Sequence, residues 1–454
     1  MKNIFKFLSL FFCIVLLIAI TGCKKKYTVT FMDYDGTVLK EDIVKKGESA
    51  TAPITPSRDG YIFTSWSGEY TNVLKDSICI AQYRPDELKY ELSKDKKFYL
   101  VTGLKSRFNK KNVIIPASYN NLPVIGISDC AFSDCISLES IEIPNSVTSI
   151  GKMAFVGCTS LESIEIPNSV TSIGESAFFG CTSLESIEIP NSVTSIGDSA
   201  FRACRSLVSI TIPFVGATLD GTINTHFNYI FGQVPSSLKE VTVTGGMSIG
   251  DSAFSGFTSL ESIKIPNSVT SIGESAFKGC RNLVSIKIPN SVTSIGDSAF
   301  KGCTILESIE IPNSVTSIGE SAFSRCTSLE SIEIPNSVTS IGGRAFYGCT
   351  SLESIVIPNS VTSIGESAFY KCTSLESIEI PNSVTSIGGW AFYGCTSLES
   401  IEIPNSVTSI GGGAFSGCTS LTIYCEVTSK PDGWITYWND SNCPVIWGYE
   451  KEQE

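Results

Sequence analysis

Apolar residues recur along most of this chain with a fixed period of 23 residues. The stretch CTSLESIEIPNSVTSIGESAF returns almost letter for letter, and its apolar positions keep their places in each copy. Such a period is typical of a solenoid, because one unit cannot bury its apolar face alone and stacks on copies of itself. The repeat leucine marks 13 turns: Leu138, Leu161, Leu184, Leu207, Leu238, Leu260, Leu283, Leu306, Leu329, Leu352, Leu375, Leu398 and Leu421.

Within one turn, the order of apolar and polar residues predicts two short strands. The segment LESIEIP places its leucine and isoleucines inward, and proline ends strand pairing because it has no N–H to donate. The segment VTSIG predicts a second extended stretch, and ESAFFGC predicts a turn of helix with alanine, phenylalanine and cysteine pointing inward. Strands of successive turns should pair in parallel about 4.8 Å apart, so the stack should be roughly 60 Å long.

Cysteine recurs once per turn with the same spacing of 23 residues, in the runs 135–204 and 280–418. The chain has 17 cysteines, which in an exported protein would normally indicate disulfides. Phe257, however, takes the cysteine position in the turn between the runs, and phenylalanine can replace neither a disulfide partner nor a metal ligand. We therefore interpret this column as core packing, with disulfides or metal sites as alternatives. Cys425 and Cys443 lie outside the period and could bridge a C-terminal cap.

One turn departs from the period. The step from Leu207 to Leu238 spans 31 residues, and the additional residues fall in the segment 214–235. Insertions in solenoids map to one face as loops and often carry function, whereas a kink or an old fusion point is the alternative. The insertion also contains the only histidine of the chain, His226, and no recognisable nucleophile motif surrounds it.

The signature L-x-x-I-x-I-P…I-G-x-x-A-F-x-x-C resembles that of the BspA-like leucine-rich repeat family over roughly residues 88 to 447. The resemblance implies a β-rich α/β repeat solenoid, a right-handed leucine-rich-repeat stack of 23-residue turns. Residues 85–122 then form its N-terminal cap, residues 123–424 the repeats, and residues 425–454 a C-terminal cap and tail. The family implies adhesion to host extracellular matrix or to other cells.

Residues 27–84 lie outside the repeat, and their alternation around a turn at Asp35-Gly36 predicts a small β-rich module. The segment resembles the internalin B-repeat, also called the Listeria–Bacteroides repeat. Ser65 is a departure, since a glycine usually precedes the tryptophan. The resemblance implies a β-grasp-like spacer or interaction module without catalysis. The matching residues are VTFMDYDGTVL, Gly47, Pro53, Pro56, RDGYIFTSW and the closing AQY.

The chain begins with a basic segment and a run from Phe7 to Ile20 that is apolar apart from Ser9. This run is too short for a membrane-spanning helix, which needs about 20 residues, but it is typical of a signal peptide. The segment IAITGC resembles a bacterial lipobox, which implies a signal peptide 1–22, lipidation of Cys23 and a linker to residue 26. We expect a lipid-anchored protein on the bacterial cell surface, at the outer membrane if the cell is Gram-negative. A plain secreted protein is the alternative.

The formal net charge of -12 at pH 7 disfavours nucleic acid, because phosphate recognition depends on Lys and Arg. The phosphate-loop, dinucleotide and zinc-protease motifs are absent from the sequence, so we expect no enzyme, no cofactor and no metal. The carboxylates of LESIEIP repeat as one column, which indicates a solvated acidic stripe, since a catalytic pair needs two unlike environments. The stripe comprises Glu142, Glu165, Glu188, Glu310, Glu333, Glu379 and Glu402.

The tail brings three of the five tryptophans, Trp434, Trp438 and Trp447. Their expected role is to cover the last turn with aromatic bulk. The alternative is a surface lipoprotein that captures carbohydrate or peptide with these tryptophans or with the 214–235 insertion.

The residue after the repeat phenylalanine is the most variable position of the turn. Tyr347, Tyr370 and Tyr393 occupy it in consecutive turns, and Arg344 and Trp390 each lie three residues before one of them. Exposed Tyr, Trp and Arg are the composition of interface hot spots, so we predict binding at these residues. Flat packing of each ring on its neighbour is the alternative. We expect a monomer whose partner is a host extracellular matrix or cell-surface protein, and whose membrane contact is the lipid anchor alone.

Overall fold

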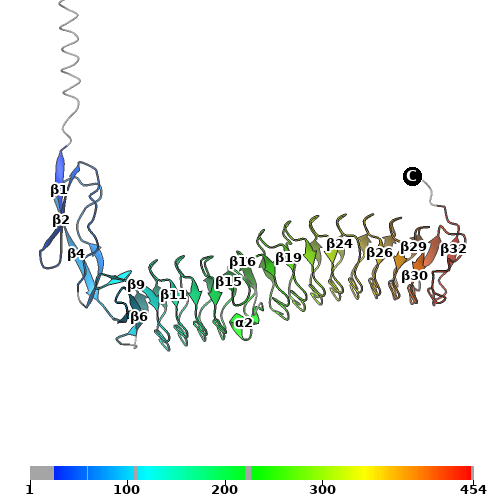
Figure 1. Ribbon diagram of the computed structural model, residues 1–454, viewed down its shortest axis with the longest axis horizontal. Coiled ribbons are helices and arrows are strands. Elements are labelled where there is room, and N and C mark those ends of the chain that lie inside the picture. The colour runs from blue at the N-terminus through cyan, green and yellow to red at the C-terminus, as the bar shows by residue number, and fades with distance from the viewer. Residues whose placement is uncertain (1–24, 59, 107–109, 220–225, 451–454) are drawn as a thin grey trace, which may run out of the picture. The chain divides into compact units, whose positions relative to one another are not determined.

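The computed structural model describes residues 25–58, 60–106, 110–219 and 226–450, in two compact units (Figure 1). The first unit extends to residue 87 and includes 118–122, and the second comprises 88–117 and the chain from 123 onward. The predicted signal peptide and lipidation site Cys23 lie outside the described residues. Within the described ranges, no helix is long and apolar enough to cross a membrane.

The first unit is a four-stranded mixed sheet in the order β2-β1-β4-β3. β1 and β2 form the predicted hairpin, where Gly36 takes a φ of 88°, and β1 pairs with β4 in parallel. Val29, Phe31 and Cys79 form the buried core on one face. Ser65 lies at a bulge between β3 and β4. The strands are β1 (Lys26–Met32), β2 (Val38–Lys45), β3 (Tyr61–Trp66) and β4 (Ser77–Pro85).

The solenoid begins with an antiparallel hairpin of β5 and β6. β6 then pairs in parallel with β9, and β9 pairs in parallel with the first regular strand of its column. The apolar edge of the first turn is therefore covered by a hairpin of different sequence. The strands are β5 (Leu88–Leu92), β6 (Tyr99–Leu104), β8 (Ser118–Tyr119) and β9 (Leu122–Ile127).

The segment LESIEIP contributes one short strand per turn to a long parallel column (Figure 1). Equivalent residues pair directly, as Ile332 does with Ile355. Residues 162–165 hold the same place without strand geometry, so the column counts about 15 turns, the 13 predicted ones and one more at each end. The strands are β7 (Asn112–Ile114), β10 (Ser140–Glu142), β13 (Ser186–Glu188), β15 (Ser209–Ile212), β16 (Glu240–Val243), β18 (Ser262–Lys264), β20 (Ser285–Ile286), β22 (Ser308–Glu310), β24 (Ser331–Glu333), β25 (Ser354–Val356), β27 (Ser377–Glu379), β29 (Ser400–Ile403), β31 (Thr422–Cys425) and β32 (Val445–Trp447).

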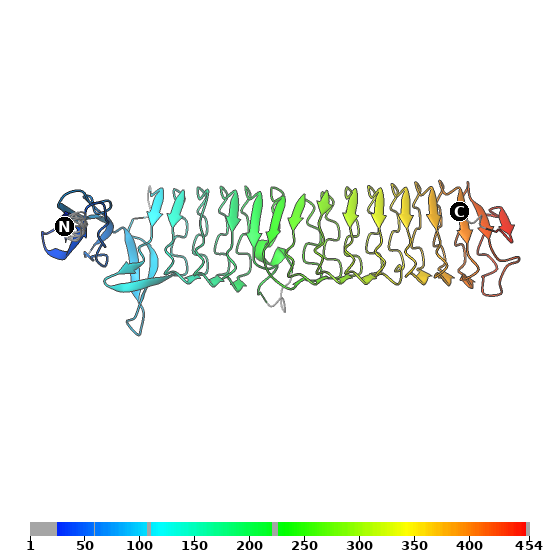
Figure 2. The ribbon, with the colours of Figure 1, turned by 90° about the horizontal axis from the view of Figure 1, so that it is seen from above.

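The segment VTSIG forms the second predicted strand, and Figure 2 shows the two strand columns as separate rows. Polar side chains link its turns: Thr171 Oγ1 donates to the carbonyl of Thr148 in the preceding turn at 3.1 Å. This bond recurs along the column, and the same carbonyl also accepts the main-chain N–H of the threonine, as Thr148 does from Thr171 at 2.8 Å. The strands are β11 (Ser149–Ile150), β12 (Ser172–Ile173), β14 (Ser195–Ile196), β17 (Ser248–Ile249), β19 (Ser271–Ile272), β21 (Ser294–Ile295), β23 (Ser317–Ile318), β26 (Ser363–Ile364), β28 (Ser386–Ile387) and β30 (Ser409–Ile410).

The segment ESAFFGC differs from its prediction, because it forms consecutive turns and not a turn of helix. Ser176 and Gly180 take left-handed φ values of 54° and 74°, which a right-handed helix excludes. The N–H of Phe155 instead donates to the carbonyl of Ala177 in the next turn at 2.8 Å. The segment thus adds a third column of hydrogen bonds between turns. Among the described residues the only helix is α2 (Asn228–Phe231).

The predicted inward residues do fill the core. Ala177, Phe178 and Cys181 are fully buried, and the same holds in the neighbouring turns. Successive repeat phenylalanines stack face to face, with ring centroids 5.3 Å apart and planes 2° apart between Phe178 and Phe201. A continuous aromatic stack therefore runs along the solenoid beside the three columns of hydrogen bonds.

The cysteine column agrees with the packing interpretation. Every cysteine of the described chain is a free thiol, and Cys372 Sγ donates to the carbonyl of Phe346 in the preceding turn at 3.2 Å. Burial raises the pKa of the Cys372 thiol to about 12. The thiol therefore stays neutral at physiological pH, whereas a metal ligand or nucleophile is a thiolate. Phe257, which takes the cysteine position in one turn, is buried in the same way.

The 214–235 insertion builds a turn of its own, as far as the structure describes it. The N–H of Ile196 donates to the carbonyl of Ala217 at 2.9 Å, so the insertion continues the second strand column. α2 then places Phe231 in the core, tilted by 39° against the preceding phenylalanine of the stack. Residues 220–225 of the insertion lie outside the described residues.

The tail closes the last turn, and two of its three tryptophans lie in the core, whereas Trp447 is 36% exposed. Trp434 and Trp438 are 1% and 5% exposed. The indole N–H of Trp434 donates to a main-chain carbonyl of the last turn at 3.1 Å, and Trp438 stands edge-on to Phe415 at 5.8 Å. These two rings therefore offer no open face to a sugar. A disulfide between Cys425 and Cys443 was one possibility from the sequence, but both are buried free thiols.

Candidate binding surface

The only histidine of the chain is held by the main chain. His226 is exposed, and its Nδ1 lies 3.2 Å from the carbonyl of Ser252. A ring nitrogen that faces a carbonyl oxygen serves as a donor and is not available there as a base. No group of three or more His, Cys, Asp or Glu side chains within the described ranges is placed to hold a metal ion.

The acidic stripe lies exposed on the long strand column. Glu310 and Glu333 pair directly across β22 and β24, and a shallow hollow of about 500 Å³ beside them is also lined by Asn290 and Asn313. Like charges at this spacing are tolerated because both side chains face water, which screens their repulsion. The stripe is thus a solvated face, as predicted, and Val356 interrupts it.

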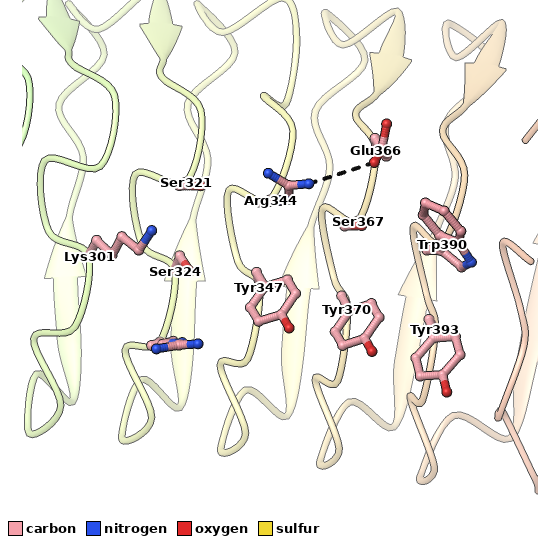
Figure 3. A pocket seen from close by; sticks show the side chains of 11 residues that line it. Lys301, Ser321, Ser324, Arg344, Tyr347, Glu366, Ser367, Tyr370, Trp390 and Tyr393 are labelled. Carbon is pink, nitrogen blue, oxygen red and sulfur yellow. Dashed lines mark ion pairs between the residues drawn. The ribbon is translucent and has the colours of Figure 1, made fainter.

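The five residues predicted as a binding site lie together around one hollow of about 580 Å³ (Figure 3). They reach it from three consecutive turns, because equivalent positions of stacked turns form columns on one face. We call this feature the aromatic hollow. Its lining residues include Arg344, Tyr347, Tyr370, Trp390 and Tyr393, with Lys301, Ser324 and Arg325 at one end.

The three tyrosines form a second, outer aromatic stack. Their ring centroids are 4.6 Å apart, with planes 2° apart between Tyr347 and Tyr370 and 6° apart between Tyr370 and Tyr393. The rings are half-buried, and Figure 3 shows their hydroxyl groups on the same side. Each ring does lie flat on its neighbour, so the stack meets a partner mainly with ring edges and a row of hydroxyl groups. Such a row offers both hydrogen-bond donors and acceptors.

Trp390 is the most exposed aromatic ring of the hollow, at 50%. The following turn makes room for it: a Cβ at Gly413 would lie 2.8 Å from Trp390 Cδ1. Most turns carry a serine where the chain has Gly413, in the sequence ESAF or DSAF instead of GGAF. Gly413 therefore leaves room for the indole. The sequence shows this glycine, but only the contact with Trp390 explains why it stands there.

Arg344 takes the same left-handed position as Trp390, with a φ of 56°. Its guanidinium lies 3.6 Å from Glu320 and 3.9 Å from Glu366, and all three side chains are more than half exposed. Such pairs contribute little to stability because water and salt screen them. The two carboxylates instead orient the arginine over the hollow, as Figure 3 shows for Glu366.

Sequence reasoning missed two further cations, Arg325, which lines the hollow, and Lys371, which lies next to Tyr370. Arg325 and Lys371 have φ values of 61° and 56° at a position where most turns carry glycine. A left-handed backbone costs an L-residue about 1–2 kcal/mol, and such strain is concentrated at functional sites. Lys371 lies over the Tyr370 ring, with Nζ 5.7 Å from its centroid. The signal was the loss of glycine from F-x-G-C in the turn before Tyr347 and in the turn of Tyr370 itself.

Replacing Arg325 or Lys371 with glycine should raise the free energy of unfolding by about 0.5–1 kcal/mol each, because glycine adopts this φ without strain. Urea denaturation of the single variants measures the change. Lys301→Gly is the matched control: its backbone is not left-handed, so glycine should destabilise that position by a similar amount. Loss of stability in all three variants would show that the left-handed cations are not strained.

Comparison with known proteins places both units in families. The model of the BspA type leucine rich repeat region matches residues 125–247, 247–365 and 339–429. The model of the Listeria-Bacteroides repeat domain matches residues 27–76. A search of curated proteins finds no match.

Several solved bacterial structures are similar to this chain. A leucine-rich repeat protein from Bacteroides ovatus is 32% identical over 80% of this chain and 99% of its own, with a TM-score of 0.48. A leucine rich cell surface protein from Faecalibacterium prausnitzii is 31% identical over 81% and 98%, with a TM-score of 0.35. The T. pallidum leucine rich repeat protein is 28% identical over 54% and 88%, with a TM-score of 0.31. The repeat match covers more than half of the sequence, and the chain belongs to the BspA-type leucine-rich repeat family.

Proposed function

We propose that this chain is a bacterial cell-surface protein that binds a host extracellular matrix or cell-surface protein through the aromatic hollow. Its solenoid is of a type that serves protein–protein interaction in surface proteins. In this proposal the chain is a binding scaffold without enzymatic activity, tethered to the membrane through lipidated Cys23 and acting as a monomer. The module of residues 27–76, which matches the Listeria-Bacteroides repeat, lies between Cys23 and the solenoid in the sequence.

The observation that supports this function best is the composition of the aromatic hollow. Serine is the commonest residue at these positions elsewhere, and no other regular turn carries tyrosine or tryptophan there, but here three tyrosines, a tryptophan and several cations gather in adjacent turns. Tyr, Trp and Arg are the residues that contribute most to protein interfaces. The hollow is shallow and extends over several turns, a shape that suits a protein surface better than a small molecule.

Four substitutions remove the aromatic side chains of the hollow and leave the buried core residues unchanged. Tyr347→Ser, Tyr370→Ser, Tyr393→Ser and Trp390→Ser, combined in one variant, introduce the residue that other turns carry in the same columns. We expect saturable binding of the full chain to at least one of immobilised fibronectin, fibrinogen, collagen and laminin. The combined variant should bind at least about tenfold more weakly, while its thermal unfolding changes little.

A matched control comes from a distant turn. Val156→Ser and Met153→Ser change the same two columns outside the hollow and should leave binding intact. Equal weakening by the control, or no binding to any of the four proteins, would reject the proposed site. A large loss of thermal stability in the tyrosine and tryptophan variant would show instead that the rings serve packing. Binding on a glycan array alone would favour the carbohydrate-capture alternative.

A further inference from the structure

A second hollow, of about 650 Å³, lies where the regular repeat meets the irregular turn that contains α2. It is separate from the aromatic hollow, and the two have no lining residue in common. We call it the arginine hollow. It is lined by Phe179, Arg202, Ala203, Arg205, Gln233, Val234, Pro235, Ser236, Gly256, Phe257, Thr258 and Ser259.

The arginine hollow exists because a column of hydrogen bonds breaks there. In regular turns the N–H at the left-handed position donates to the next turn, as Gly180 does to the carbonyl of Arg202 at 2.8 Å and Gly256 to that of Lys278 at 2.7 Å. The equivalent N–H of Ala203 has no acceptor in the part of the chain that the structure describes. A main-chain donor without a partner is rare in folded proteins. It leaves one N–H at the wall of the hollow for a ligand.

The side chains add charge to this donor. Arg202 and Arg205 line the hollow, and neither forms an ion pair with any residue in the described ranges. Arg205 replaces the threonine that links turns elsewhere, where Thr182 Oγ1 donates to the carbonyl of Thr159 at 3.3 Å. No acidic residue lines the hollow, although the chain as a whole has a net charge of -12. The arginine hollow is therefore a local cationic site on an acidic protein.

We propose that the arginine hollow binds a carboxylate of an acidic peptide segment. Guanidinium groups match the planar, bidentate geometry of a carboxylate, and the free N–H of Ala203 offers a third donor. A sugar would need an open ring face, and none is offered: the Arg202 guanidinium lies 5.7 Å from the Phe179 centroid, and Phe257 is buried. Ser236 and Thr258 also line the hollow, and hydroxyl groups can both donate to and accept from a peptide main chain.

This inference does not depend on the proposed function, because it rests on other residues and another probe. The residues at 202 and 205 belong to columns that recur in later turns, where Lys278 and Arg281 carry the same charges away from the arginine hollow. The chain thus contains its own control for the effect of charge alone. Arg202→Ser and Arg205→Thr also install the commonest residues of their columns, so the fold is expected to persist.

The test measures fluorescence anisotropy of labelled hexaglutamate with the full chain. We expect binding that weakens as salt rises, and no binding of hexaglutamine. The double variant R202S/R205T should bind hexaglutamate about tenfold more weakly, whereas K278S/R281T, which removes the same net charge from the same columns, should change the affinity less than about twofold.

Three results would overturn the proposal: no hexaglutamate binding by the full chain, equal weakening in the two double variants, or equal binding of hexaglutamine. Polygalacturonate serves as a competitor, since its carboxylates belong to a sugar chain. If it displaced the label at lower carboxylate concentration than unlabelled hexaglutamate, the site would be one for acidic glycans. A circular dichroism melt of both double variants confirms that each is folded when its affinity is measured.

Discussion

Raising the pH from 8 to 10 should lower the free energy of unfolding of this solenoid by several kcal/mol. Burial raises the pKa of the Cys372 thiol from 9.0 to about 12, and five other buried thiols shift equally far. Above pH 9 the unfolded chain loses these protons while the native chain keeps them. Each such thiol therefore lowers stability by about 1.4 kcal/mol per pH unit up to pH 12, and its full contribution is present below pH 9.

Urea denaturation at pH 8, 9 and 10 measures this slope. Lysines and tyrosines also titrate in this range, so the comparison requires a matched variant. Cys372→Ala removes one thiol and shifts stability by a constant amount from the lost packing. Between pH 8 and 10, wild type should lose about 1.4 kcal/mol more than this variant. Parallel curves for the two proteins would show that the thiol ionises equally in the native and unfolded chains.

Replacing Phe323 with alanine should cost about 3–5 kcal/mol of the free energy of unfolding. Its ring is fully buried and stacks on both sides, 5.5 Å from Phe300 and 5.6 Å from Phe346. Since each turn of a solenoid contacts only its neighbours, the cavity also weakens the coupling between the turns before and after it. We expect a broader unfolding transition in which the two halves separate.

Chemical denaturation and hydrogen exchange test this expectation together. Phe323→Leu is the control, because it conserves most of the volume and should cost less than about 1.5 kcal/mol. Hydrogen exchange should accelerate first in the turns next to residue 323. A loss for alanine no greater than that for leucine, with a single sharp transition, would mean that the stack contributes little to stability.

The repeat alone predicted the core and both strand columns, because an invariant apolar position in a stacked unit leaves few alternatives. It predicted a helical turn at ESAFFGC wrongly. Alanine and phenylalanine suit a helix, but the N–H groups of this segment form bonds to the next turn, as Phe155 does to Ala177. The helix preference of a residue does not depend on a hydrogen-bond partner that lies one full repeat away in the sequence. The buried places of Trp434 and Trp438 followed from the need to cover the last turn.

The sequence predicted more of the aromatic hollow than of the arginine hollow. The aromatic hollow was predicted in position, because Tyr347, Tyr370 and Tyr393 stand out against a nearly constant background. Its left-handed cations were missed, since lysine in place of glycine is informative only when the backbone angle is known. The arginine hollow depends on the unpaired N–H of Ala203, which no residue pattern reveals.

The near-identity of the turns also has a genetic consequence. Successive regular turns pair equivalent residues in the same register, as Ser354 pairs with both Ser331 and Ser377. Recombination between two copies of the repeat in the gene would add or remove a whole unit and leave each remaining interface unchanged. Adding turns before Tyr347 would lengthen the spacing between the aromatic hollow and the first turn of the solenoid by about 4.8 Å each. Natural variants of such a protein should therefore differ in length by multiples of one repeat unit. The length of the solenoid should vary among them more than its stability does.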